Sequence, residues 1–197
     1  MLIGIDVDLT LVDSGTAWWE WLERLYGPAS KAVAKPSNGL MYYDLSKYWP
    51  DRPKENIIGP FDFWSDPFLY DFLKPEEGAI EVMKDLVARG HKLAFISVCK
   101  KGHLASKSRF LKRWTSDFMD LDDHTQGHGF YATHFKGNVA VDVIIDDRHE
   151  YLNQFASRPE VIKILKDTPY EQFEELKVSV DYTANSWYKI GKFLEGI

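Results

Sequence analysis

Two carboxylates at the end of a short apolar segment offer the clearest chemistry in the sequence. Residues 2–5 (Leu-Ile-Gly-Ile) have the character of a buried strand, and Asp6 and Asp8 follow directly. In extended backbone, side chains two residues apart point to the same side, so these carboxylates are expected to converge. Such a pair repels unless a cation lies between its members, and Mg2+ prefers oxygen ligands. The pair therefore favours a metal site, while an Asp-rich turn would explain the same residues.

Polar residues follow other apolar segments in the same way. Ser97 comes directly after one of them, and Asp146 and Asp147 come directly after another, with Lys136 in the preceding loop. Each residue alone has a structural explanation, as a helix cap, a turn or a solvated lysine. The carboxyl ends of parallel strands gather at one edge, where such sheets bind ligands. Acids, a hydroxyl and an ammonium at that edge are the groups that metal-assisted phosphoryl transfer requires.

The elements expected to position these residues alternate between helix and strand. Helical spacing of apolar residues predicts helices at 16–26, 78–90, 104–118 and from Ser186 onward. Apolar runs predict further strands at 92–96, 130–134, 139–145 and 161–165. This alternation is typical of an α/β fold with a parallel sheet and right-handed crossovers.

Residues 14–74 differ in composition from the rest of the chain. They are rich in aromatic residues and prolines and show no strand alternation, so we expect a compact, mainly helical insert. Most of its aromatic side chains are expected in its own core, because they bury a large area. The predicted domains are therefore a core of residues 1–13 and 75–197 and an inserted cap of residues 14–74.

The bulk composition limits the class of protein. A length of 197 residues with 45% hydrophobic side chains indicates one globular core with a small insert. A net charge of -6 provides no broad basic surface for polymeric nucleic acid. The single cysteine, Cys99, fits a reducing compartment. We find no signal-peptide pattern and no apolar run of about 20 residues, and so expect a cytoplasmic protein without a membrane partner.

The chain resembles the haloacid dehalogenase (HAD) superfamily of aspartate-nucleophile phosphatases. Residues 6–10 (DVDLT) match its first motif, and residues 95–97 (FIS) match the second. Lys136 matches the third motif, and residues 143–147 (VIIDD) match the fourth. The motifs span most of the chain in the expected order. The resemblance implies an α/β, Rossmann-like parallel sheet with a small helical cap inserted after the first strand.

Within this superfamily, the chain is most similar to the 5'(3')-deoxyribonucleotidases. Residues 64–79 resemble the aromatic-to-PxPGA segment that joins cap to core, and residues 185–190 resemble the C-terminal helix with an NW motif. The spacing from Lys136 to residues 143–148 also resembles that family. The resemblance implies a cytoplasmic, Mg2+-dependent hydrolase of deoxyribonucleoside monophosphates, and a homodimer.

The resemblance also implies catalytic roles. Asp6 would attack the phosphorus atom and form an aspartyl-phosphate, and Asp8 would protonate the leaving oxygen and then activate water. Neighbouring carboxylates would favour a protonated Asp8. Ser97 and Lys136 would bind the phosphoryl oxygens.

Metal binding would involve Asp6, the backbone carbonyl of Asp8, and Asp147. Asp146 would act indirectly or through water.

In the cap, Trp64 is the first candidate to stack on a pyrimidine, followed by Trp18, Trp19, Tyr42 or Tyr43. The chain departs from the family at two positions. Thr10 stands where many members have Val or Gly-Val, and Ser14 stands where vertebrate enzymes place an aromatic side chain against the base.

Three other functions remain open from the sequence. The first is a HAD phosphatase for another small monoester, such as a sugar phosphate. The second is a 3'-phosphatase on DNA ends, which the acidic charge and the large cap disfavour. The third is a non-catalytic nucleotide-binding protein, which would normally lack one of Asp6, Asp8, Lys136 or Asp147. Lys100, Lys101, Lys107 and Arg148 are interpreted as solvated, and His134, His149 and Cys99 as incidental.

Overall fold

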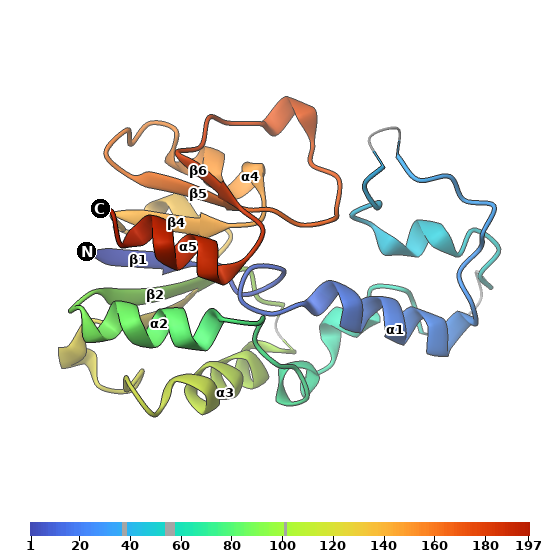
Figure 1. The fold of residues 1–197 in the computed structure, drawn as a ribbon. Helices are drawn as coiled ribbons and strands as arrows, with labels where there is room; N and C mark the ends of the chain where they lie inside the picture. The colour runs from blue at the N-terminus through green and yellow to red at the C-terminus, as the bar shows by residue number, and fades with distance from the viewer. Residues whose placement is uncertain (37–38, 54–57, 101) are drawn as a thin grey trace.

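A six-stranded parallel sheet forms the centre of the protein (Figure 1). The fold is that of a computed structural model, which describes residues 1–36, 39–53, 58–100 and 102–197. The strand order is β3-β2-β1-β4-β5-β6. The strands are β1 (Leu2–Ile5), β2 (Lys92–Ser97), β3 (Gly129–Ala132), β4 (Val143–Asp146), β5 (Ile162–Lys166) and β6 (Tyr182–Ala184). The chain therefore has the predicted α/β, Rossmann-like architecture, with the first motif on a central strand.

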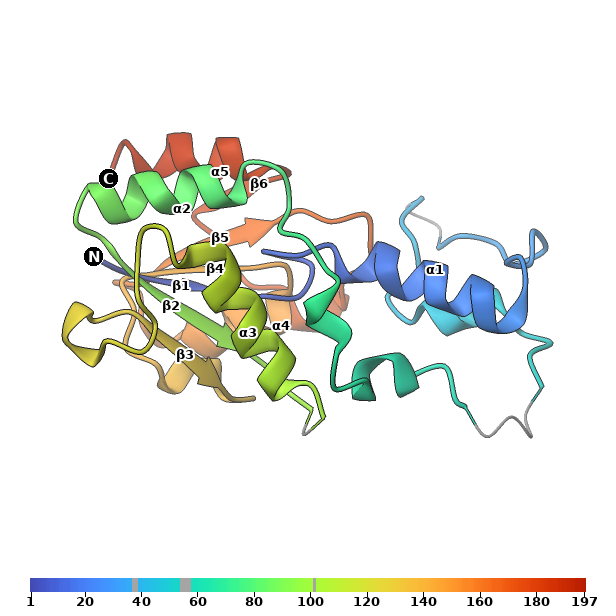
Figure 2. The ribbon, with the colours of Figure 1, turned by 90° about the horizontal axis from the view of Figure 1, so that it is seen from below.

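Helices cover both faces of this sheet. They are α2 (Ala79–Ala88), α3 (Leu104–Thr115), α4 (His149–Leu152) and α5 (Trp187–Leu194), whereas α1 (Ser14–Tyr26) lies beyond the strand ends. Ile3 and Ile5 of β1 pack in one apolar cluster with side chains of α2, α3 and α5, and α2 lies beside α5 in both views (Figures 1 and 2). Ile96 and Ile144 point to the opposite face and pack with Leu152 of α4. Because adjacent side chains of a strand alternate between faces, both clusters draw on the same short strands.

Most predicted elements are present within a few residues of their expected ends. Ser186 caps α5 as predicted, since its hydroxyl accepts a hydrogen bond from the backbone N–H of Lys189. Two short elements, β6 and α4, were not predicted. They are three and four residues long, and periodicity has little to act on over so short a stretch.

The inserted segment is less helical than predicted. Among its described residues, α1 is the only α-helix, and the remainder consists of turns and three short 3-10 helices, at Leu45–Tyr48, Asp62–Ser65 and Leu69–Asp71. Aromatic contacts hold these turns together. The ring of Trp19 lies 5.2 Å from that of Tyr48 and 5.1 Å from that of Trp49. Trp18 also donates its indole N–H to the Pro60 carbonyl over 2.8 Å.

The insert lies beyond the carboxyl ends of the strands (Figure 1). Its two connections to the core meet at an antiparallel bridge between Val12 and Pro75. The backbone N–H of Glu76 also donates to the Leu11 carbonyl over 2.8 Å. Within the part of the chain that is described, no helix has the length and apolar character needed to cross a membrane.

Candidate active site

The loop after β1 is tightly closed, and it presents Asp6 and Asp8 at the edge of the sheet. The backbone N–H groups of Leu11 and Val12 both donate to the Val7 carbonyl, over 3.0 and 2.9 Å. Leu9 adopts a left-handed conformation with φ 59°, which is uncommon for a residue other than glycine. This turn places Asp6 and Asp8 in separate environments.

Asp6 lies in a buried ion-pair network. The Lys136 ammonium lies 2.7 Å from Oδ1 of Asp6 and 2.6 Å from Oδ2 of Asp146, and it is fully buried. Burial raises the pKa of Asp6 to about 7, although the lysine charge opposes the shift. Burial alone would lower the pKa of Lys136, but Asp146 and Asp6 reverse that effect and raise it. Lys136 therefore stays charged and balances these acids.

Asp147 offers the site a carboxylate oxygen that has no protein partner. Its Oδ2 is buried without a hydrogen bond among the described residues, whereas Oδ1 lies 3.5 Å from the Thr10 hydroxyl. Carboxylate oxygens of Asp6, Asp146 and Asp147 lie within 4.8 Å of one another. In Asp146, however, Oδ2 accepts from Lys136 and Oδ1 accepts from the Arg148 backbone N–H over 3.0 Å. This donor set suits a hard cation such as Mg2+, with Asp147 more available than Asp146.

Asp8 is bound to different partners. The Tyr70 hydroxyl donates to its Oδ1 over 2.5 Å, and the Lys107 ammonium donates to its Oδ2 over 2.7 Å. Burial would raise the pKa of Asp8, but the charge and hydrogen bond of Lys107 outweigh burial and lower it. In the free protein Asp8 is therefore ionised, contrary to the expectation that neighbouring carboxylates would keep it protonated.

Lys107 was wrongly interpreted as a solvated lysine. Its side chain is fully buried, and its ammonium also donates to the Ser97 hydroxyl over 2.9 Å and to the Val98 carbonyl over 3.2 Å. The spacing of Lys107 with Phe110 and Leu111 is a signal for the inward side of α3, but the sequence does not show the partners that allow a charged side chain to be buried there. Ser97, at the end of β2, keeps its own O–H available as a donor.

These groups surround a small hollow of about 70 Å³ at the sheet edge. It is lined by Asp6, Asp8, Tyr43, Ser97, Val98, Lys136, Asp147, Arg148 and Tyr151. Sequence reasoning did not assign Tyr151 to the site and interpreted Arg148 as solvated. Arg148 is in fact 3% exposed, and its guanidinium carbon lies 3.9 Å from the centre of the Tyr43 ring. The hollow thus carries two cations, Lys136 and Arg148, beside its acids.

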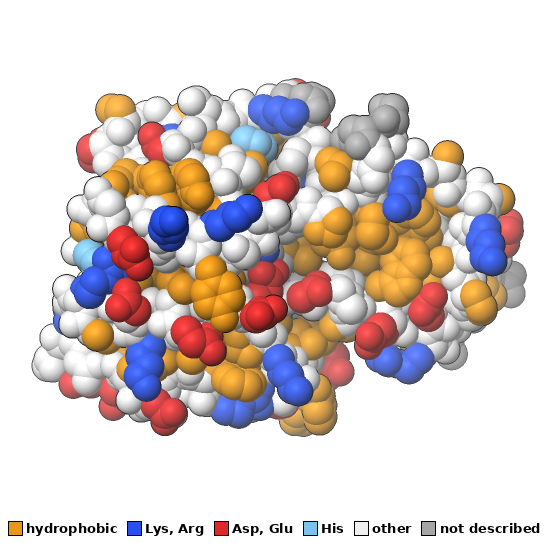
Figure 3. Space-filling view, in the orientation of Figure 1, with side chains coloured by type: hydrophobic (Ala, Val, Ile, Leu, Met, Phe, Trp, Pro, Cys, Tyr) orange, Lys and Arg blue, Asp and Glu red, His pale blue; other side chains and the backbone are white. Residues whose placement is uncertain are grey.

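An apolar cavity of about 240 Å³ adjoins this hollow. Its lining side chains come from the insert and the adjoining loops, namely Leu9, Gly15, Trp18, Tyr43, Asp44, Leu45, Phe61, Trp64, Lys100 and Tyr170. Tyr43 lines both spaces, which therefore lie next to each other. The space-filling view shows a broad group of hydrophobic side chains on the insert (Figure 3).

The aromatic candidates fall into two groups. Trp64, Trp18 and Tyr43 line the apolar cavity, and the rings of Trp18 and Trp64 lie 5.7 Å apart. Trp19 and Tyr42 instead pack on Tyr48, inside the insert. Both are therefore structural aromatics of the insert in this structure.

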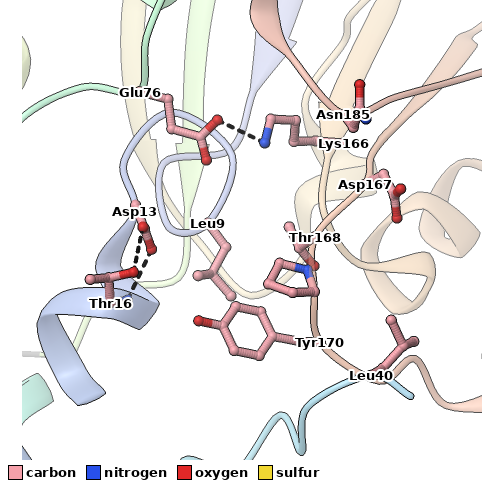
Figure 4. A pocket seen from close by; sticks show the side chains of 11 residues that line it. Leu9, Asp13, Thr16, Leu40, Glu76, Lys166, Asp167, Thr168, Tyr170 and Asn185 are labelled. Carbon is pink, nitrogen blue, oxygen red and sulfur yellow. Dashed lines mark hydrogen bonds and ion pairs between the residues drawn. The ribbon is translucent and has the colours of Figure 1, made fainter. Parts of the chain in front are cut away.

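A polar hollow of about 510 Å³ lies on the other side of Leu9 and Tyr170 (Figure 4). Here Lys166, at the end of β5, forms an ion pair with Glu76 over 2.7 Å. Lys166 is 4% exposed, so it is a third buried lysine with a carboxylate partner, after Lys107 and Lys136. The pair joins the end of β5 to Glu76, in the segment that leads from the insert back to the core.

Other residues considered from the sequence have mainly structural contacts. His149 is buried, and its Nδ1 accepts from the Val178 backbone N–H over 3.4 Å. Thr10 is also buried, and its carbonyl accepts from the Trp187 indole over 2.8 Å. Cys99 is partly exposed, and burial raises its pKa, so its thiol is not activated. Lys101 lies outside the described residues.

Comparison with known proteins agrees with this geometry. Residues 1–194 match the model of a family described as 5' nucleotidase, deoxy (pyrimidine), cytosolic type C protein (NT5C). The chain belongs to this family. A crystal structure titled as a haloacid dehalogenase-like hydrolase, from Burkholderia xenovorans LB400, has the same fold with a TM-score of 0.52. That protein is 14% identical, and the match covers 99% of this chain and 96% of the other. No curated protein matches the chain.

Family membership identifies the chain as a hydrolase of phosphate monoesters, of the 5'-nucleotidase type. The predicted HAD-like fold is confirmed by the parallel sheet and its structural neighbour.

Proposed function

We propose that the chain is a Mg2+-dependent phosphatase that uses Asp6 as its nucleophile and hydrolyses deoxyribonucleoside monophosphates. The observation that carries this proposal is that the two spaces lie next to each other and share Tyr43 in their lining. A polar hollow with acids and buried cations adjoins an apolar cavity lined by aromatic rings. A nucleoside monophosphate has the matching halves, an anionic phosphate and a flat base.

The first chemical step is transfer of the phosphoryl group to Asp6. A carboxylate oxygen of Asp6 forms a bond to phosphorus while the ester P–O bond breaks, and the bonding electrons leave with the ester oxygen. Asp8 gives its proton to that oxygen, so that a neutral alcohol departs. The substrate's negative charge next to Asp8 raises its pKa relative to the free protein, which supports this protonated state.

The second step releases phosphate and restores both acids. Asp8, now ionised, takes a proton from a water molecule as the water oxygen bonds to phosphorus. The Asp6–phosphorus bond breaks, and its electrons return to the Asp6 carboxylate. Lys136, Arg148 and the Ser97 hydroxyl are the donors available to the phosphoryl oxygens throughout.

Asp6, Asp147 and the backbone carbonyl of Asp8 would hold the metal ion. Oδ2 of Asp147, which has no hydrogen-bond partner among the described residues, supports this assignment. Both Asp146 oxygens, by contrast, already accept hydrogen bonds, from Lys136 and from the Arg148 backbone N–H. When bound, Mg2+ supplies positive charge against the phosphoryl oxygens. Asp146 acts on the site through Lys136, which it fixes beside Asp6.

The base would lie in the apolar cavity, against Trp64 and its neighbours. Base–aromatic stacking contributes about 1–3 kcal/mol per base in nucleic-acid sites, which is enough to decide between substrates. A sugar phosphate has no flat apolar group to fill this cavity, so the aromatic lining favours the nucleotide over that alternative.

Phosphate release from a substrate panel tests this function. The panel contains 5'- and 3'-deoxyribonucleoside monophosphates and sugar phosphates, each with Mg2+ or with a chelator, for wild type and Asp6→Asn. We expect metal-dependent turnover of deoxyribonucleotides that Asp6→Asn abolishes. Turnover of sugar phosphates alone would retain the mechanism and reject the nucleotide assignment. Nucleotide binding without turnover would identify a non-catalytic binding protein.

A further inference from the structure

Both oxygens of the Asp8 carboxylate are held by side chains from outside its own motif. Tyr70 donates to Oδ1 and Lys107 donates to Oδ2, over 2.5 and 2.7 Å. Because each oxygen has its own donor, the plane of the carboxylate is fixed as well as its position. The terminal torsion of an aspartate is otherwise soft, so one donor alone would leave the carboxylate free to turn.

Tyr70 and Lys107 are themselves rigidly placed. Tyr70 is fully buried, and its ring lies 5.3 Å from that of His103. The short helix that carries Tyr70 is fastened to α3, since Arg109 forms an ion pair with Asp71 and Arg113 donates to the Asp71 carbonyl over 2.8 Å. Lys107 lies on the same α3. The two donors are therefore held as one unit, although they are far apart in sequence.

The site uses separate cations for its two acids. Lys136 pairs with Asp6 and Asp146, whereas Lys107 pairs with Asp8. No hydrogen bond joins Tyr70 or Lys107 to Asp6 among the described contacts. Loss of either donor is therefore expected to act on Asp8 rather than on the nucleophile.

From this division we infer that Tyr70 and Lys107 are positioning residues, which aim the Asp8 carboxyl at the leaving oxygen of the substrate. The inference rests on the proposed function. In the step concerned, the ester P–O bond breaks, its electrons go to the leaving oxygen, and the Asp8 proton forms the new O–H bond. General acid–base groups contribute about 10²–10⁴-fold to such steps, and that contribution depends on hydrogen-bond reach.

A double-mutant cycle tests whether the two donors act through Asp8. The single variants are Tyr70→Phe, Lys107→Met and Asp8→Asn. The double variants combine Asp8→Asn with Tyr70→Phe and with Lys107→Met. The measurement is kcat for a deoxyribonucleotide at saturating Mg2+. We expect Tyr70→Phe alone to lower kcat by about tenfold or more, as a part of the general-acid contribution. In the Asp8→Asn background, we expect Tyr70→Phe to change kcat by less than about twofold, whereas Lys107→Met should keep only the smaller part of its effect that acts through Ser97, to whose hydroxyl Lys107 also donates.

The leaving group provides a second test. A substrate with sulfur in place of the bridging 5'-oxygen releases a thiol, whose pKa of about 8.5 lets it depart without a proton. Asp8 also acts in the second step, which is common to both substrates, so the readout is the initial burst of leaving-group release. Tyr70→Phe, Lys107→Met and Asp8→Asn should slow this burst much less with the sulfur substrate than with the oxygen ester. A variant that only disturbed the fold would lose activity equally with both.

Tyr26→Phe is the matched control. Tyr26 donates to the Ile58 carbonyl over 3.2 Å within the insert, away from Asp8. Its ratio of burst rates for the oxygen and sulfur substrates should equal that of wild type. Effects of Tyr70→Phe and Lys107→Met that add fully to Asp8→Asn would overturn the inference, as would an unchanged ratio. Absence of metal-dependent turnover in wild type would instead reject the proposed function.

Discussion

Replacement of Lys136 by methionine should destabilise the protein and at the same time tighten its binding of Mg2+. Lys136 is fully buried, and its ammonium lies 2.7 Å from Asp6 and 2.6 Å from Asp146. Methionine has a similar length but no charge. The variant therefore leaves a buried group of three carboxylates, including Asp147, without its cation.

The size of both effects follows from the buried charges. Removing one partner of a buried ion pair typically costs about 3–5 kcal/mol of unfolding free energy. Two like charges about 4 Å apart repel by about 4 kcal/mol at an effective dielectric constant of about 20. In Lys136→Met, the lysine ammonium no longer repels a Mg2+ ion bound at the same acids. We therefore expect Mg2+ to bind at least about tenfold more tightly, which corresponds to about 1.4 kcal/mol.

Urea unfolding at pH 8 measures both effects. Wild type and Lys136→Met are unfolded with a chelator and then over a series of MgCl2 concentrations. The chelator series should show the loss of about 3–5 kcal/mol, and the Mg2+ series should restore more stability to the variant than to wild type. Burial raises the pKa of Asp6 to about 7. Because Lys136→Met lacks the charge that opposes this shift, the pKa of Asp6 lies higher still in the folded variant, so the stability penalty should shrink as the pH falls from 8.

Lys166→Met is the matched control, since Lys166 is also buried and pairs with a carboxylate, Glu76, over 2.7 Å. It should lose stability but respond to Mg2+ as wild type does. An equal response to Mg2+ in wild type and Lys136→Met would refute the argument that Lys136 and the cation share one group of acids.

Three other predictions follow from the site and its surroundings. Trp64→Leu should raise KM for deoxyribonucleotides by about 5- to 150-fold, the equivalent of a lost stacking contact of about 1–3 kcal/mol, while the inhibition constant of inorganic phosphate stays unchanged. Gly15→Ala should lower the unfolding free energy by about 1–3 kcal/mol, because its new Cβ would overlap the Tyr170 hydroxyl, and urea unfolding would show this. Burial lowers the pKa of His103 to about 4, so His103 becomes protonated at a lower pH in the folded state than in the unfolded state. The stability of wild type relative to His103→Asn should therefore fall as the pH drops from about 6.5 to about 4, as measured by urea unfolding at several pH values.

The groups at the strand ends were predictable because each lies beside a clear local pattern. Asp6, Ser97 and Asp147 directly follow buried apolar runs, and Lys136 lies at a fixed distance before one of them. Parallel pairing then brings the strand ends together whatever the loops do. The fold, and the neighbourhood of these four residues, could therefore be predicted without coordinates.

The partners of Asp8 could not be predicted in the same way. Tyr70 lies 62 residues from Asp8, in a turn-rich segment whose aromatic residues all resemble core residues. Its role depends on how that segment packs on α3, and no periodic signal describes such packing. Lys107 carried a signal in its helical spacing, but a charged side chain is rarely fully buried unless it is paired, and the sequence does not show the pair.

Charge balance connects the metal, the acids and the substrate. The described site contains four acids, Asp6, Asp8, Asp146 and Asp147, and two buried lysines, Lys107 and Lys136. With every group ionised and the buried Arg148 guanidinium of the same hollow included, these side chains sum to one negative charge, so one divalent cation would leave a net positive charge for the phosphoryl group. Without that cation, burial and neighbouring acids raise the pKa of Asp147 well above its usual value, so protons take the place of the metal. The binding of a divalent cation to this site should therefore release protons, and the site's acids are most fully ionised when the cation that the mechanism requires is present.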